Sequence, residues 1–231
     1  NIEYVIKHNK EIKKNKFHIL QNYQVLFQKS DIETVSVKTR YGLTGKYVAV
    51  FGGNMGKPQQ LENVLALAKY CEIYDDVLFL LLGEGLQKKK LESIIRKGNH
   101  KNIRIQDTIP KRDYQNLISQ CQIGLISLHE SFTIPNIPSK VLDYFNVGLP
   151  VLSSIDKATD FGKILDQSGA GLWSYAGDID AFVANFDALY SNPNLRKKMG
   201  TNGRKYFESN LTPEIAYHTI ISHFNQSTKE F

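Results

Sequence analysis

The 231-residue sequence has few cysteines and no long hydrophobic run. Its two cysteines, Cys71 and Cys121, lack the spacing of a metal site, so we expect buried free thiols in a reducing compartment. A membrane-spanning helix needs about 20 apolar residues, whereas the longest candidate, Val77–Leu82, has the length of a strand. Residues 1–24 are polar and lysine-rich and do not resemble a signal peptide. These features argue against a cysteine-based metal module and a membrane-spanning helix.

Familiar nucleotide- and metal-binding motifs are missing too. The loop after the expected strand Tyr47–Gly53 has neither the Gly-Lys-Ser/Thr ending of a Walker motif nor the pattern G-x-G-x-x-G. Asp178-Ile179-Asp180 spells the Asp-x-Asp that holds a divalent ion in some enzymes. It precedes an amphipathic helix, however, and acidic residues favour the start of a helix. We therefore expect no metal site.

Composition and charge limit the choice of partner. The hydrophobic fraction of 42% and charged fraction of 23% are those of an ordinary globular protein. The net charge of +6 favours anionic partners, such as phosphates or an anionic lipid surface. Basic residues are not clustered with aromatic residues, which argues against nucleic-acid binding. For most lysines a solvated surface is the better interpretation.

Strand and helix patterns alternate through most of the chain. Six strands are expected, at 47–53, 77–82, 103–106, 123–128, 151–153 and 170–174, of which the first two read as buried, and a further short strand at 17–20. The clearest helices are expected at 86–97, 112–120, 159–167, 194–207 and 212–225. The alternation predicts an α/β fold, a Rossmann-like parallel sheet with helices on both faces.

Ligands of such sheets bind beyond the carboxyl ends of the strands. Five loops follow strands and should share that edge: 52–57, 83–85, 108–110, 129–140 and 153–155. The first is rich in glycine and lies between a buried strand and a helix, which suits a phosphate, although a tight turn without a ligand explains the glycines equally well. The loop 129–137 is long for a compact domain and is therefore a candidate ligand loop.

The most informative stretch is Pro138–Leu152. Ser139 stands where a helix should begin, and we expect its side chain to cap the helix start, whose free N–H groups also attract a phosphate. Lys140 adds a positive charge. Asp143, one turn deeper on the same side, is placed to accept hydrogen bonds from ribose hydroxyls. The simpler alternative is a capped amphipathic helix whose core residues are Val141, Leu142 and Phe145.

This stretch resembles the core motif of glycosyltransferase family 4, a family of GT-B enzymes. In that motif a helix with an acidic residue precedes a Gly-x-Pro-Val turn. Here Asp143 stands at the acidic position and residues 148–151 form the turn. The form Pro-Ser-Lys-x-x-(Asp/Glu)-Tyr resembles a branch found among bacterial polysaccharide enzymes. The resemblance extends over about residues 17–224 and includes a connector-like segment, His18–Asn22.

The resemblance implies the carboxy-terminal half of a GT-B enzyme, which binds a nucleotide sugar, with a UDP-sugar the first choice. Such an enzyme would be a retaining, metal-independent hexosyltransferase without a further cofactor. Its acceptor would be a glycan or a lipid-linked glycan, and it would act in the cytoplasm or at the inner face of the membrane.

The same resemblance suggests a division of the chain. Residues 1–45 would be an inter-domain connector and the start of the domain, and 46–210 the donor-binding domain. Residues 211–231 would form a helix that packs toward an amino-terminal acceptor domain. We expect the fragment alone to bind nucleotide weakly and to show no transferase activity.

The resemblance also implies the site. The residues expected at the donor are Gly53, Asn54, Lys57, Gly83, Thr108, Ile109, Ser139, Lys140 and Asp143. The family's glycine loop carries an arginine and a Lys-Gly pair that meet the diphosphate, whereas this chain has Asn54 and Gln59-Gln60, with Lys57 the nearest basic residue. The family's Glu-x7-Glu pair is absent because Pro135 stands eight residues before Asp143. The catalytic residue stays unassigned, with Glu130 as a candidate.

Two alternatives stay open. A GT-B sugar-nucleotide epimerase shares the fold and uses several acids and histidines around the donor. A non-catalytic nucleotide-binding subunit would pair with a separate acceptor-binding chain.

Overall fold

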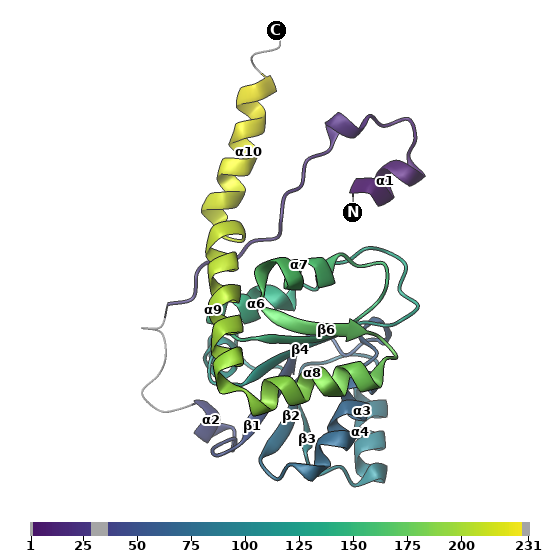
Figure 1. The fold of residues 1–231 in the computed structure, drawn as a ribbon, viewed down its shortest axis with the longest axis vertical. Coiled ribbons are helices and arrows are strands. Elements are labelled where there is room, and N and C mark those ends of the chain that lie inside the picture. Colours follow the sequence, from purple (N-terminus) through teal and green to yellow (C-terminus); the bar gives the residue numbers. More distant parts are fainter. Residues whose placement is uncertain (1, 29–36, 228–231) are drawn as a thin grey trace.

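A parallel six-stranded sheet forms the centre of the described part of the chain, in the order β3-β2-β1-β4-β5-β6 (Figure 1). The structure is a computed structural model and describes residues 2–28 and 37–227. The strands are β1 (Tyr47–Gly52), β2 (Val77–Leu82), β3 (Ile103–Gln106), β4 (Ile123–Ser127), β5 (Val151–Ile155) and β6 (Gly171–Tyr175). The chain winds outward in both directions from β1 and β4, so the switch point of the sheet lies between these two strands.

The helices cover both faces, as the sequence predicts. They are α1 (Ile2–His8), α2 (Val37–Arg40), α3 (Glu62–Tyr70), α4 (Lys88–Gly98), α5 (Lys111–Ile118), α6 (Lys140–Val147), α7 (Phe161–Ser168), α8 (Ile179–Ser191), α9 (Pro193–Asn210) and α10 (Pro213–Ser227). Short 3-10 turns occur at Lys14–Lys16, Lys57–Gln59 and Cys71–Ile73. The predicted Rossmann-like fold class is therefore confirmed.

Two hydrophobic cores lie on opposite faces of the sheet. One holds Val48 and Val50 of β1 with side chains of α5, α6, α7 and α9. The other holds Ala49 and Phe51 of the same strand with side chains of α3, α4 and α8. Alternate residues of β1 thus enter opposite cores, and all six are buried. A strand that is covered on both faces reads as a continuous apolar run, which explains why the sequence marked it so clearly.

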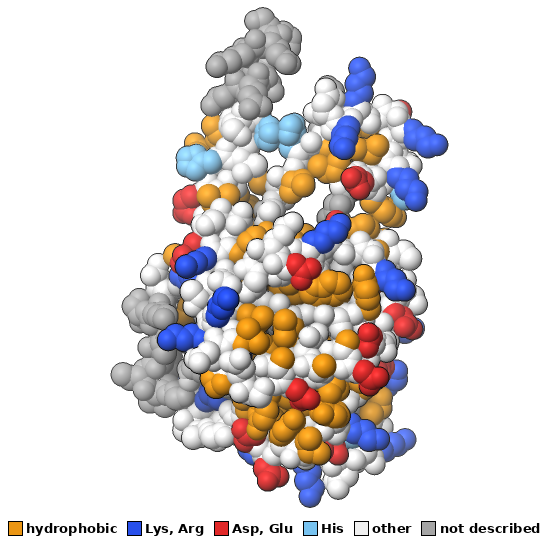
Figure 2. Space-filling model, viewed as in Figure 1, with side chains coloured by type: hydrophobic (Ala, Val, Ile, Leu, Met, Phe, Trp, Pro, Cys, Tyr) orange, Lys and Arg blue, Asp and Glu red, His pale blue; other side chains and the backbone are white. Residues whose placement is uncertain are grey.

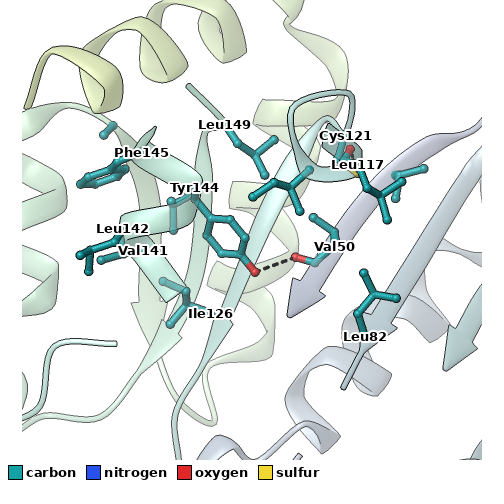
Figure 3. Close-up of a cluster of buried hydrophobic side chains, with 14 of the residues drawn as sticks. Val50, Leu82, Leu117, Cys121, Ile126, Val141, Leu142, Tyr144, Phe145 and Leu149 are labelled. Carbon is teal, nitrogen blue, oxygen red and sulfur yellow. Dashed lines mark hydrogen bonds between the residues drawn. The ribbon is translucent and has the colours of Figure 1, made fainter. Parts of the chain in front are cut away.

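Tyr144 of α6 joins its helix to the switch point of the sheet. The side chain is fully buried, and its hydroxyl lies 3.2 Å from the carbonyl oxygen of Val50 on β1 (Figure 3). It also lies 3.3 Å from the carbonyl oxygen of Leu125 on β4. The N–H of Gly52 donates to the same hydroxyl at 3.2 Å. Burial raises the pKa of Tyr144, so the hydroxyl keeps its proton.

The connector between α1 and the sheet is not a strand. The expected strand at Phe17–Leu20 is wrong, because this segment is irregular and pairs with none of the strands in the described part of the chain. Further on, the N–H of Gln24 donates to the carbonyl of Leu211, which lies between α9 and α10, at 3.0 Å. Figure 1 shows this segment rising beside α10, which projects beyond the sheet.

A buried asparagine anchors the connector to α6. The Asn146 side chain donates to the carbonyl of Val25 at 2.9 Å and accepts from the N–H of Phe27 at 2.8 Å. Arg204 of α9 donates to the carbonyl of Phe27 at 3.2 Å. The side chain of Asn146 therefore takes the place that a neighbouring strand would occupy.

Other expectations concern single residues. Cys71 and Cys121 are buried and free, as predicted. Asp178 accepts from the N–H of Ala181 at 3.0 Å, which confirms that Asp178 serves the start of α8.

The described helices include none with the length and apolar character required to cross a bilayer. Figure 2 shows Lys and Arg side chains scattered over the visible face among acidic ones, which agrees with a solvated surface.

Gly83 sits where the ends of β1 and β2 approach closely. Its φ is +146°, and a Cβ placed there would lie 1.9 Å from the carbonyl oxygen of Gly53. The opposing atom belongs to the backbone and cannot move aside as a side chain would.

We expect Asn146→Ala to lower the free energy of unfolding by about 2 kcal/mol, because the buried N–H of Phe27 loses its acceptor. Urea unfolding measures the change. The control is Asn210→Ala, which removes one hydrogen bond to the carbonyl of Tyr206 within α9. This change should lower the free energy of unfolding by less than about 1 kcal/mol. An equal loss in both variants would contradict the anchoring role.

We expect Gly83→Ala to destabilise the chain by about 3 kcal/mol or more, because the new methyl group meets backbone in a conformation that favours glycine. Thermal unfolding tests this. Gly45→Ala is the matched control: its φ is also positive, but no atom lies within 4 Å of the added Cβ. A melting temperature as high for Gly83→Ala as for Gly45→Ala would contradict the packing account.

Candidate functional site

A cleft of about 880 Å³ opens at the carboxyl edge of the sheet. It is lined by the ends of β1 and β2, the loops that follow β1 and β3, the starts of α5 and α6, and connector residues Leu20–Gln24. This is the edge predicted from the strand order, beside the switch point between β1 and β4. Its volume lies in the range of small-molecule and cofactor sites.

Most of the residues expected at the donor line this one cleft. They are Gly53, Asn54, Thr108, Ile109, Ser139, Lys140 and Asp143. The described lining does not include Lys57 or Gly83. Lys57 is exposed on the loop after β1, and Gly83 packs against the backbone of Gly53. The sequence thus placed the cleft from loops that are far apart along the chain.

The start of α6 differs from the expectation in one respect. Ser139 makes no side-chain capping bond, so the predicted cap is wrong. Its backbone is already helical, with φ −60° and ψ −25°, and a capping residue normally has an extended backbone. The carbonyl of Pro138 accepts from the N–H of Val141 at 3.1 Å instead. The Ser139 hydroxyl is exposed and faces the same cleft as the helix start.

Lys140 places an ammonium at this helix start without a carboxylate partner among the described residues. Its Nζ donates to Oε1 of Gln59 at 2.8 Å and lies 4.7 Å from the centre of the Phe51 ring. Burial lowers the pKa of Lys140 from 10.5 to about 8. A half-buried cation that only neutral groups contact is complementary to an anion that enters the cleft.

Asp143 lies one turn further along α6 and is half-buried in the same cleft. Its Oδ1 accepts from Nε2 of Gln24 at 2.9 Å. The sequence did not indicate Gln24, which is 119 residues away in a segment without periodicity. Only the resemblance of the nearby residues His18–Asn22 to a connector pointed to this neighbourhood.

Residues at the far side of the cleft also escaped the prediction. Lys111, the first residue of α5, adds a second basic group, and Tyr114 forms part of the wall. A Cβ on Gly52 would lie 2.2 Å from the Tyr114 hydroxyl, so this glycine makes room for the ring. Burial raises the pKa of Tyr114 well above its usual value, and the phenol stays neutral.

Glu130 lies elsewhere. It lines a separate pocket of about 330 Å³ with Asp156, Lys157 and Tyr175, at the ends of β5 and β6. None of the described residues lines both this pocket and the cleft. The N–H of Glu130 donates to Oε1 of Gln60 at 2.9 Å, which fixes the backbone of the loop.

Comparisons with curated proteins point to transferases of sugars. The chain is 24% identical over 127 residues to the probable glycosyltransferase WbjE of Pseudomonas aeruginosa, covering 55% of this chain and 32% of that protein. It is 24% identical over 182 residues to the putative colanic acid biosynthesis glycosyl transferase WcaI of Escherichia coli K12, covering 77% and 42%. The chain thus spans less than half the length of these relatives.

Solved structures share the fold. A structure of Anabaena Alr3699/HepE in complex with UDP superposes with a TM-score of 0.79 at 14% identity, covering 95% of this chain and 60% of that one. The C-terminal domain of a glycosyl transferase group 1 family protein (LpcC) from Francisella tularensis superposes with a TM-score of 0.62 at 17% identity, covering 83% and 96%. Both agree with the parallel sheet and its flanking helices.

The family itself follows from a match to most of the chain. The family model described as Glycosyl transferases group 1 matches residues 38–206, which include all six strands and the cleft loops that follow them. The chain belongs to the group 1 glycosyltransferases and has their GT-B type of Rossmann-like domain.

Proposed function

We propose that this chain is the donor-binding domain of a UDP-sugar-dependent glycosyltransferase that acts in the synthesis of a polysaccharide or lipid-linked glycan. The observation that carries the proposal is the cleft at the start of α6, where Lys140 and Asp143 lie one turn apart. HepE structures with UDP and with UDP-glucose support the choice of nucleotide.

The start of α6 is suited to the diphosphate. The exposed hydroxyl of Ser139 and the ammonium of Lys140 belong to this end of the helix. The N–H groups of Val141 and Leu142 already donate to the carbonyls of Pro138 and Ser139, so the hydroxyl and the ammonium are the groups proposed to meet the diphosphate. Negative charge develops on the diphosphate as the sugar leaves, and groups already held in place stabilise that charge without reorganisation. These groups belong to the chain itself, which supports the proposal that no metal is required.

The nucleoside end extends toward α5. Asp143 would accept from the ribose hydroxyls and fix the donor in position. Thr108 and Ile109 line the cleft, and their backbone groups would meet the base. A retaining, hexosyl-transferring reaction follows from the resemblance to glycosyltransferase family 4 alone. Glu130 lines a separate pocket, so it is not placed to act on a donor in this cleft.

The acceptor would contact a domain other than the one described here. We therefore propose that residues 1–231 alone bind nucleotide weakly and transfer no sugar, and that the whole enzyme works in the cytoplasm or peripherally at the inner face of the membrane. The described lining of the cleft includes one carboxylate, Asp143, and no histidine. This composition does not favour the epimerase alternative, which requires several such groups.

Titration calorimetry with UDP, GDP and ADP tests the site. We expect UDP to bind best, and Lys140→Ala to weaken UDP binding by about tenfold or more, because a charge-assisted contact to the diphosphate is lost. Asp143→Ala should weaken it by a similar factor. Lys97→Ala removes an exposed lysine of α4 that is not part of the cleft lining, and serves as the control. Unchanged binding in both cleft variants would remove the proposed site.

The lowered pKa of Lys140 predicts a pH dependence. The diphosphate binds the protonated ammonium, so binding is strongest below the free pKa of about 8 and weakens above it by up to about tenfold per pH unit. The phosphate itself is fully ionised from about pH 7, because its second pKa is about 6. UDP affinity measured between about pH 7 and about pH 9.5 checks this. Lys140→Arg keeps its charge and should flatten the profile; an equally steep decline in Lys140→Arg would contradict the assignment.

A further inference from the structure

We infer that Gln24 of the connector reads the ribose together with Asp143, so that each residue supplies one acceptor to the vicinal diol of the nucleotide. This inference rests on the proposed function, because it deepens the nucleotide site described above. It assigns a specificity role to a residue outside the strand–helix units of the domain.

The two side chains meet inside the cleft. Both line it, and Gln24 Nε2 donates to Asp143 Oδ1 at 2.9 Å. A carboxylate can only accept hydrogen bonds, so Gln24 must turn its amide nitrogen toward Asp143. Its amide oxygen then has to lie on the other side of the group. Two acceptor oxygens, Oδ2 of Asp143 and Oε1 of Gln24, are not used by this contact, and they belong to side chains that touch in space.

The backbone of Gln24 is held in place independently of this contact. Its N–H donates to the carbonyl of Leu211 at 3.0 Å. Just beyond it, Asn146 binds the carbonyl of Val25 and the N–H of Phe27. Since Asn146 follows Asp143 by three residues, the two side chains leave the same face of α6. One helix face thus positions both members of the pair.

A ribose diol has two hydroxyl groups, and each donates one hydrogen bond. Asp143 Oδ1 is already engaged by Gln24, so a carboxylate alone would have to share this oxygen between two donors. With the amide oxygen of Gln24 available, one hydroxyl bonds to Oδ2 and the other to Oε1. A nucleotide that lacks either hydroxyl leaves one half-buried acceptor without its donor, and sites built for a hydroxyl reject such analogues strongly.

The test compares UDP with 2′-deoxy-UDP and 3′-deoxy-UDP on the whole 231-residue chain by titration calorimetry. We expect the original chain to bind UDP about tenfold or more tightly than each deoxy analogue. In Gln24→Ala the ratio of the affinity for UDP to that for one deoxy analogue should fall close to one. The same ratio for the other analogue should stay at about tenfold or more. Gln24→Glu places a second carboxylate beside Asp143 and should weaken all three nucleotides.

The matched control is Gln21→Ala, which removes another amide of the same connector from the cleft lining. We expect it to keep the preference of the original chain for UDP over both analogues. A merely structural role of Gln24 would weaken all three nucleotides by one factor, so unchanged ratios in Gln24→Ala would overturn the inference while leaving the nucleotide site intact. Failure of the original chain to bind UDP would overturn the proposed function and this inference with it.

Discussion

The buried hydroxyl of Tyr144 sets the position of α6, and the site depends on that helix. The hydroxyl contacts carbonyl oxygens on β1 and β4 and accepts from a third backbone group, the N–H of Gly52. A buried hydroxyl that loses such partners costs about 1–3 kcal/mol. Rotation of α6 about its axis would break these contacts. The angle at which the helix faces the cleft is therefore fixed where the sheet reverses its strand order.

The short helix α6 contacts the hydrophobic core, the cleft and the connector. Val141, Leu142 and Phe145 are buried in the core, which confirms the amphipathic helix of the simpler interpretation but not its serine cap. Of the polar residues of the same helix, Lys140 and Asp143 reach the cleft, and Asn146 holds the connector. The two interpretations weighed from the sequence are compatible, because a helix that packs tightly on one face holds its polar side chains more precisely on the others.

Local patterns predicted the centre of the sheet because β1, β2 and β4 are short apolar runs that are buried along their whole length. The alternation of strands and helices then predicted the carboxyl edge of the sheet, where the cleft loops lie. The serine cap failed because Ser139 has a helical backbone, a property that residue type alone does not fix. The strand at Phe17–Leu20 failed because a strand also needs a neighbour. Gln24 was out of reach, since its contact with Asp143 exists only once residues 119 positions apart are folded together.

The unusual composition of the glycine loop fits the geometry around Lys140. The resemblance led us to expect basic residues where Asn54 and Gln59-Gln60 stand. In the structure the amide oxygen of Gln59 lies 2.8 Å from Nζ of Lys140. A lysine at position 59 would bring a second ammonium to this point, and two like charges at such a distance repel strongly where water is partly excluded. A neutral acceptor keeps the ammonium oriented and leaves its charge for an incoming anion. The neutral residue at position 59, which departs from the family pattern, therefore suits the charge of Lys140 at the helix start.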